Sequence, residues 1–415
     1  MIASLAAGAG LLGACYAIGR ISNLVEAPGL FLWLFACAFV CYLVGAWWLA
    51  EDDQPRSLTV VLVIGLGARL VLAPVPPTLS TDAYRYVWDA RVAHAGVDPY
   101  AHAPTADELV GLRDPDIFPR LNHPTWRTIY PPGAQAFFRL VYRIQPDSVM
   151  AMKLAVGLAE IAGLATVLGL LRAGGRPLSS AVIYAWNPLL LVEVWGMGHL
   201  DGLVIPAVVG AMWAAMRARY VLAGALLGAG ALVKLYPAVL LVLVAPAAWI
   251  PVLASFAAVV LGGYLPWLLS GASVLGSLPR YVGEEYFNPG PLRSIVDSPM
   301  IAVAAALAWI VVASLLRRKA PLPVRAIPLI GGLLVLSRNI FPWYAVWLLP
   351  FLAYAPSIPW ILFTGTVAFA YTFFLSQPWA VPGWARALEL VPLALGGLWW
   401  LASRLPAARA VEPSP

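Results

Sequence analysis

Apolar runs long enough to cross a bilayer recur along the whole chain of 415 residues. A helix needs about 17–25 mostly apolar residues to span the hydrocarbon core. Only 11% of the residues are charged, whereas a soluble domain carries about 25%. The runs are rich in Leu, Val, Ala and Gly and lack the alternation of barrel strands. The sequence therefore predicts an all-α polytopic membrane protein with about 12–14 transmembrane helices.

One long polar stretch, residues 77–148, interrupts the apolar runs. Three predicted spans precede it within residues 1–76, and the others lie within residues 149–415, which include a second polar loop at 271–298. Residues 133–144 are too short to cross the bilayer and carry two arginines, so we expect a helix lying in the interface. The chain is thus expected to form one membrane domain whose large first loop carries interfacial helices.

The basic residues give the predicted orientation of the chain. They are concentrated in one set of short loops between spans, which by the positive-inside rule face the cytoplasm. Residues 77–148 and 271–298 then face outward. Because the net charge of +6 comes from basic residues scattered over short loops, it does not indicate a nucleic-acid partner.

The polar stretch opens with a helix-start signal followed by carboxylates. Ser80 can cap a helix and place Asp82 in its first turn. Asp82, Arg85 and Asp89 then share one helix face at spacings of i, i+3 and i+7. Asp82 either pairs with Arg85 and the helix dipole in a structural role, or acts as a catalytic group at the mouth of the bundle. The sequence leaves both interpretations open.

A second motif, residues 128–133 (Thr-Ile-Tyr-Pro-Pro-Gly), predicts an extended approach to the interfacial helix. Tyr130 suits the level of the lipid headgroups. The neighbouring His123 and Arg127 have the chemistry to contact a sugar or a phosphate. The two prolines are best explained as a plain helix-start signal.

A third motif, residues 196–202 (Gly-Met-Gly-His-Leu-Asp-Gly), forms an outward loop between two predicted spans. Glycines let the backbone approach a ligand closely, and His199 and Asp201 at a helix mouth indicate a functional site. A tight turn with an aspartate cap explains the same residues equally well. Their spacing makes no complete metal site. No metal or other cofactor is therefore predicted.

Four basic residues are predicted at or near the outer membrane surface: Arg69, Lys234, Arg293 and Arg338. Burying such a charge costs several kcal/mol unless it is paired or snorkels to the interface. Snorkelling is the structural explanation for each of them. The functional explanation is phosphate binding, for which Arg supplies a bidentate donor and Lys a point charge.

Carboxylates and cations on one membrane face suit the transfer of a sugar from a lipid phosphate to a hydroxyl. The cations stabilise the phosphate as it leaves. The carboxylate accepts the hydroxyl proton while the anomeric carbon passes through an oxocarbenium-like state. Because a phosphate leaves with little protonation, one carboxylate base suffices, and direct displacement inverts the anomeric centre.

In their order and spacing these motifs resemble the polyprenyl-phosphate-sugar-dependent glycosyltransferases of the GT-C fold. Within that fold the chain most resembles glycosyltransferase family 87 and the neighbouring polyprenol-phosphomannose-dependent mannosyltransferases. The resemblance covers roughly residues 80–237 and is carried by Asp82, Tyr84 to Tyr86, residues 96–100 (Gly-Val-Asp-Pro-Tyr), Tyr130 to Pro132, Asn187-Pro188, residues 198–202 and residues 234–237 (Lys-Leu-Tyr-Pro).

The resemblance implies a GT-C-like bundle with Asp82 as the catalytic base and Asp201 in a second active-site loop. It leaves open whether Asp89 or His199 assists Asp82. The chain has three predicted spans before the large loop where one is usual, which leaves the first two helices without an implied role. A divalent metal is compatible with the fold, but no cluster of ligands in the sequence indicates one.

These arguments assign three groups of site residues. The expected catalytic group is Asp82, Asp201, Asp89 and His199; the expected donor-phosphate group is Lys234, Arg338, Arg293 and Arg69; the expected substrate and acceptor group is Arg85, Tyr86, His123, Arg127, Tyr130 and Tyr236.

The expected function is the transfer of a sugar, mannose first, from a polyprenyl-phosphate donor to a lipid or glycan hydroxyl. The expected place is the periplasmic face of a bacterial inner membrane, in the synthesis of cell-envelope glycans. The alternative is a lipid-linked-sugar flippase or transporter, which also uses intramembrane charges and broken helices.

Overall fold

The computed structural model describes residues 1–243 and 248–403. Every regular element in these two ranges is a helix, and extended chain pairs there only in an isolated bridge between Pro289 and Asn339. The predicted all-α class is confirmed. One of the apolar runs counted among the predicted spans, residues 237–250, lies partly outside the described residues.

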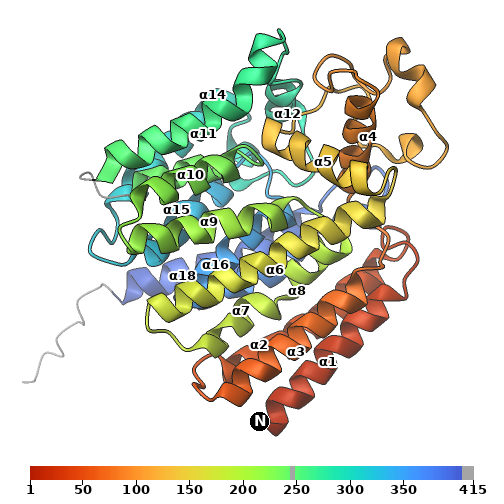
Figure 1. The fold of residues 1–415 in the computed structure, drawn as a ribbon. Helices are drawn as coiled ribbons and strands as arrows, with labels where there is room; N and C mark the ends of the chain where they lie inside the picture. Colours follow the sequence, from red (N-terminus) through yellow and green to blue (C-terminus); the bar gives the residue numbers. More distant parts are fainter. Residues whose placement is uncertain (244–247, 404–415) are drawn as a thin grey trace, which may run out of the picture.

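Long apolar helices form most of the bundle (Figure 1). Seven stretches in the described part of the chain are long and apolar enough to cross a membrane: α1 (Ile2–Gly19), α2 (Pro28–Leu49), α3 (Pro55–Leu72), α6 (Val149–Ala173), α11 (Trp249–Leu269), α17 with η8 (Ile358–Leu375) and α18 (Gly383–Ala402). Four shorter apolar helices accompany them: α9 (Asp201–Met216), α10 (Tyr220–Ala231), α14 (Pro299–Leu315) and α15 (Leu322–Leu336). The chain is thus a multi-pass membrane protein.

Fewer helices reach full spanning length than the expected count of about 12–14, because several apolar runs are broken. The clearest break follows Asn187, where the segments Leu178–Ala185 and Pro188–Gly196 meet at 54°. Asn187 Oδ1 accepts the N–H of Leu189 at 3.0 Å and so caps the second segment. That segment continues as the π-helix η4 (Leu191–Gly196), a conformation that often marks a functional site.

The polar stretch folds into two helices that lie together at one end of the bundle, α4 (Asp82–His94) and α5 (Pro132–Ile144) (Figure 1). The rings of Tyr86 and Phe138 stack between them with centroids 4.7 Å apart. The N–H of Gly133 donates to the carbonyl of Leu232 at 2.8 Å, which docks α5 on the end of α10. The predicted helix at 133–144 is confirmed, and its place in a lipid interface stays a prediction.

The first three helices form one side of the bundle (Figure 1). The Trp186 ring lies so close to Gly45 that a Cβ there would be 2.4 Å from it, and Trp186 Nε1 donates to the carbonyl of Val61 at 2.9 Å. Phe31 packs on Tyr371 of η8 with ring centroids 5.7 Å apart. The helices for which the resemblance implied no role therefore belong to the same core as the rest.

Candidate functional site

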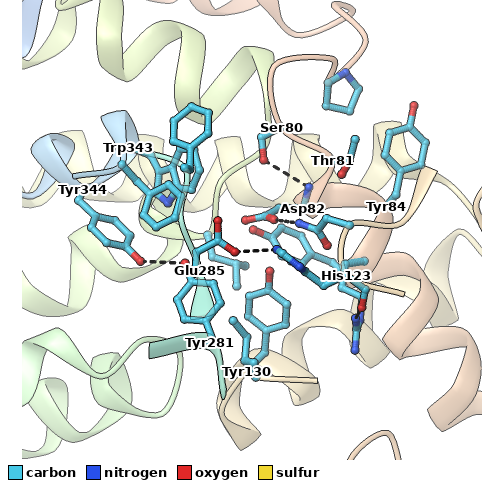
Figure 2. A pocket seen from close by; sticks show the side chains of 18 of the residues that line it. Ser80, Thr81, Asp82, Tyr84, His123, Tyr130, Tyr281, Glu285, Trp343 and Tyr344 are labelled. Atoms are coloured by element: carbon cyan, nitrogen blue, oxygen red, sulfur yellow. Dashed lines mark hydrogen bonds and ion pairs between the residues drawn. The ribbon is translucent and has the colours of Figure 1, made fainter. Parts of the chain in front are cut away.

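A cavity of about 780 Å³ lies where the polar stretch meets the bundle (Figure 2). Its walls come from the start of α4, residues 120–131, residues 233–236, α12 (Leu278–Glu284) with the residues after it, and η7 (Pro342–Leu348). It brings together eight of the predicted site residues: Asp82, Arg85, Tyr86, His123, Arg127, Tyr130, Lys234 and Tyr236.

Asp82 is the first residue of α4, and its backbone N–H donates to Ser80 Oγ at 3.4 Å. The predicted place of Asp82 in the first turn, at the positive end of the helix dipole, is confirmed. The predicted cap by Ser80 is wrong, because Thr81 is the N-cap residue and no side chain caps the helix.

Asp82 Oδ1 accepts a hydrogen bond from the Asn122 side-chain amide. Arg85 does not pair with it, because Nε of Arg85 binds Asp89 at 2.8 Å. The structural interpretation of Asp82, an ion pair with Arg85, is wrong.

Asp89 is buried and holds the loop in place. Its Oδ1 accepts from Arg85, and its Oδ2 accepts from Gln135 Nε2 at 3.0 Å. Arg85 also donates to the carbonyl of Trp126 at 2.9 Å. Asp89 does not line the cavity, which corrects its assignment to the catalytic group: both of its oxygens are used in tying α4 to the segment that carries Trp126 and to α5.

His199 lies behind Asp82 with its ring stacked on Trp343 at a centroid distance of 4.0 Å. Its Nδ1 is 3.0 Å from Glu193 Oε2 and 3.1 Å from the Glu193 carbonyl oxygen. Because a carbonyl oxygen only accepts, Nδ1 is the protonated nitrogen. The buried Nε2 has no hydrogen-bond partner among the described residues and is 4.0 Å from Asp82 Oδ2. This arrangement favours His199 over Asp89 as the neighbour that assists Asp82.

Glu193 was not predicted as a site residue, and it sits on the π-helix η4. Its Oε1 accepts from the Tyr371 hydroxyl at 2.6 Å. The extra residue in a π-turn rotates a side chain relative to regular helix, and here Glu193 faces His199 inside the bundle.

Asp201 begins α9 and is fully buried. Lys234 Nζ binds both of its oxygens, at 2.8 and 2.9 Å, and Trp347 Nε1 also donates to Oδ1. A carboxylate held in this way is not free to act as a base, which corrects its assignment to the catalytic group. Its role is to hold Lys234, which remains 25% exposed and lines the cavity.

Aromatic rings surround the Lys234 ammonium group. Its Nζ lies 4.7 Å from the ring centre of Tyr344 and 5.5 Å from that of Trp347. Tyr236 stacks on Trp347 with centroids 3.8 Å apart. Rings in this position hold the ammonium in place on the cavity wall.

The three predicted phosphate-binding arginines do not line the cavity. Arg69 is fully buried in a bidentate pair with Glu160, at 2.8 and 2.7 Å. Arg338 and Arg293 both bind Asp297, at 2.6 and 3.2 Å, and each also donates to backbone carbonyls of residues 282–285. These contacts correct the assignment: Arg69 stabilises the core, and the other two fasten the loop at 271–298.

Arg127 keeps a free guanidinium on the cavity wall. Its backbone N–H donates to Ser277 Oγ at 3.0 Å, while its side chain has no hydrogen-bond or ion-pair partner in the described ranges. Tyr130 lines the same wall, and burial raises the pKa of its hydroxyl well above the ordinary value. The hydroxyl therefore stays protonated and can donate to a ligand.

The sequence argument missed Glu285, Tyr281, Tyr344 and Asn122, which all line the cavity. Glu285 Oε2 is 2.8 Å from His123 Nε2, and the hydroxyls of Tyr281 and Tyr344 lie 3.4 Å apart. Figure 2 shows Glu285 and Asp82 reaching toward the same space from different segments. The one local signal was the acidic pair Glu284 and Glu285 in the polar loop at 271–298.

No group of three or more His, Cys, Asp or Glu side chains is placed to hold a metal ion within residues 1–243 and 248–403. The carboxylates of the cavity have protein partners instead: Asn122 for Asp82 and His123 for Glu285.

A cavity with a partly exposed carboxylate and cations, at one end of a bundle of apolar helices, has the groups that a membrane glycosyltransferase requires. Residues 1–251 match the MptA_B family model, described as alpha-(1->6)-mannopyranosyltransferase, N-terminal domain. The chain belongs to this family and is a mannosyltransferase. No curated protein matches the chain.

Proposed function

We propose that the protein transfers mannose from a polyprenyl-phosphate donor to a lipid or glycan hydroxyl on the external face of a bacterial inner membrane. The observation that carries the proposal is the cavity itself, which combines the Asp82 carboxylate with Lys234 and Arg127. The apolar helices around it suit a lipid tail, and the two cations suit the phosphate.

In the proposed reaction the acceptor hydroxyl attacks the anomeric carbon while Asp82 takes up its proton. The new carbon–oxygen bond forms as the bond to the phosphate oxygen breaks, and its electron pair leaves with the polyprenyl phosphate. Lys234 and Arg127 stabilise the charge on that phosphate. The family description names an alpha linkage, so a single inverting step requires a β-linked mannosyl phosphate.

In the proposed reaction His199 assists Asp82 in handling the proton of the acceptor hydroxyl. With its proton on Nδ1 and directed at Glu193, His199 presents Nε2 as an acceptor 4.0 Å from Asp82 Oδ2. Once Asp82 has taken up the proton of the acceptor hydroxyl, its O–H can donate to Nε2, and His199 can accept that proton.

Sugar transfer by the purified protein in lipid nanodiscs tests the proposal. Polyprenyl-phosphate-linked mannose, glucose and arabinose, each radiolabelled, are offered with a lipid extract as acceptor pool. We expect transfer from the mannose donor alone and its loss in Asp82→Asn, by about 10²–10⁴-fold. Asp107→Asn is the matched control, because Asp107 is an exposed carboxylate of the same loop outside the cavity.

Normal turnover in Asp82→Asn would show that another group is the base. Absence of transfer from every donor, with intact lipid-linked sugar crossing the bilayer of proteoliposomes, would instead establish the flippase alternative.

A further inference from the structure

The cavity holds a second carboxylate for which the proposed reaction has no use. Glu285 follows α12 and is 12% exposed, 2.8 Å from His123 Nε2. A phosphate leaves without a general acid, and Asp82 already supplies the base. A carboxylate beside the phosphate would also repel it. Glu285 is therefore suited to a neutral, hydroxyl-rich ligand rather than to the donor phosphate.

Beside Glu285 the exposed His123 ring, backed by the buried Trp126, forms a platform for a sugar ring. His123 stacks on Trp126 with centroids 4.2 Å apart and an interplanar angle of 17°. The Arg280 guanidinium lies 4.9 Å from the Trp126 ring centre, and Tyr281 meets the same ring edge-on at 6.4 Å. Flat aromatic faces pack on the apolar faces of sugars, and carboxylates accept hydrogen bonds from their hydroxyls.

The platform and Lys234 lie on different segments of the cavity wall. Lys234 follows the apolar helix α10 and is bound to the buried Asp201, whereas His123 lies in the polar stretch and is 40% exposed. A donor with a long lipid tail approaches through apolar helices, so its phosphate belongs with Lys234. The wall that carries His123 and Glu285 is left for the acceptor.

We propose that Glu285, with the stacked pair His123 and Trp126, forms the acceptor subsite and selects a sugar over a simple alcohol. The inference rests on the proposed function. When the acceptor binds, one of its hydroxyls donates to Glu285 Oε2, which has no hydrogen-bond partner among the described residues, and His123 stays stacked on Trp126. If the linkage is the (1->6) bond of the family description, the hydroxyl beside the attacking one is the 4-hydroxyl, and Glu285 receives it.

The fold holds Glu285 rigidly for this task. Its carbonyl accepts from Asn339 Nδ2 at 2.8 Å and from Arg293. Gly276, at φ 49°, lies so close to Thr128 that a Cβ would be 1.9 Å from its carbonyl oxygen. The loop of Glu285 and the segment of His123 and Trp126 are thus packed together, as a preorganised binding site requires.

The test uses the full-length protein in nanodiscs, with polyprenyl-phosphate mannose as donor. The acceptors are octyl α-mannoside, its 4-deoxy and 2-deoxy analogues, and octanol. Glu285→Gln is compared with Glu108→Gln, which removes an exposed carboxylate paired with His102 outside the cavity. We expect Glu285→Gln to raise the KM for octyl α-mannoside about 10- to 100-fold, as for loss of a charged hydrogen bond. The donor KM and the Glu108→Gln variant should stay within about twofold of wild type.

The deoxy series separates substrate binding from a structural role. The wild type should lose about tenfold or more in kcat/KM with the 4-deoxy acceptor, and the loss should disappear in Glu285→Gln. The 2-deoxy acceptor should affect both proteins equally. The wild-type arm of this series remains informative even if Glu285→Gln fails to fold.

Three results would overturn the inference while leaving the proposed function standing: equal 4-deoxy losses in both proteins, a rise in donor KM alone, or octanol accepting as well as the mannoside. If the wild type transfers mannose to no acceptor at all, the proposed function itself is wrong.

Discussion

The ion pairs Arg69–Glu160 and Lys234–Asp201 both join separate segments of the bundle, and they differ in whether the cation can reach a ligand. Arg69 and Glu160 are fully buried and bind each other through two hydrogen bonds. Carbonyls of Gly65 and Ala185 take up further N–H groups of the arginine, and Trp195 donates to the glutamate. Lys234 and Asp201 also share two hydrogen bonds, but the ammonium group faces the cavity.

The comparison shows which charged side chains inside an apolar bundle can contact a substrate. From the sequence, both cations are equally costly to bury and equally suited to phosphate. In the folded chain the guanidinium of Arg69 is enclosed by protein acceptors, whereas Lys234 keeps a partly exposed face. A substrate phosphate can reach only the second pair.

Breaking the fully buried pair Arg69–Glu160 should lower stability more than any other change considered. Arg69→Met leaves Glu160 buried without its cation, which should lower the free energy of unfolding by about 3–5 kcal/mol. The double variant Arg69→Met/Glu160→Gln should recover most of that loss and transfer mannose at the wild-type rate. Thermal unfolding in detergent and activity per folded protein check both statements. An inactive but stable double variant would mean that the pair serves the reaction.

The same pair of experiments on Lys234 should separate stability from donor use. Lys234→Gln should lower kcat/KM for the donor about 10- to 100-fold, because a charged contact to phosphate is lost. The same change should lower the stability of the fold, because the buried Asp201 carboxylate is left without its cation. Asp201→Asn/Lys234→Gln should restore the melting temperature and leave donor use impaired. Recovery of activity together with stability would contradict phosphate binding by Lys234.

Arg127 separates donor binding from stability more clearly than Lys234, because its side chain has no hydrogen-bond or ion-pair partner among the described residues. Arg127→Gln should raise the donor KM about tenfold with no change in melting temperature. Arg143→Gln is the matched control, an exposed arginine on α5 outside the cavity. Donor titrations in nanodiscs measure both, and an equal response of the two variants would exclude a specific phosphate contact.

The smallest effect is expected at Asp297, where Arg338 and Arg293 meet. The hydrogen bond from Arg338 lowers the pKa of this carboxyl. A lowered folded-state pKa means that its stabilising contribution is present above the ordinary value of about 3.9 and is lost as the pH falls through the folded-state value. Acidification below about pH 4 should therefore loosen the loop at 271–298 in the wild type more than in Asp297→Asn. Hydrogen exchange of that loop at two pH values measures the difference, and identical responses would mean that Asp297 does not fasten it.

Local patterns in the sequence predicted much of the fold. The residues before Asp82 predicted the start of α4, and Pro131-Pro132 predicted the start of α5. The helices that are long and apolar enough to cross a membrane could be predicted from the length of the apolar runs alone. The π-helix at Glu193 was not predicted, because its geometry depends on packing after the Asn187-Pro188 break.

The candidate site was predicted only in outline. Asp82, Lys234 and Arg127 reach the cavity as expected, but Asp89, Asp201, Arg69, Arg293 and Arg338 have other partners and other roles. Glu285 was missed because its partner, His123, lies far away along the chain.

The sequence by itself determined the class of protein. The length of apolar runs, the placement of charges and the signals for helix ends are local properties, so they can be recognised without knowing which residues meet in the fold. Only the tertiary structure decided which charged groups are satisfied and which are left facing a cavity. The ion pair of Lys234 with Asp201 forms between the start of α9 and the connection after α10. The packing of the whole bundle sets whether any surface of such a pair remains open to a substrate.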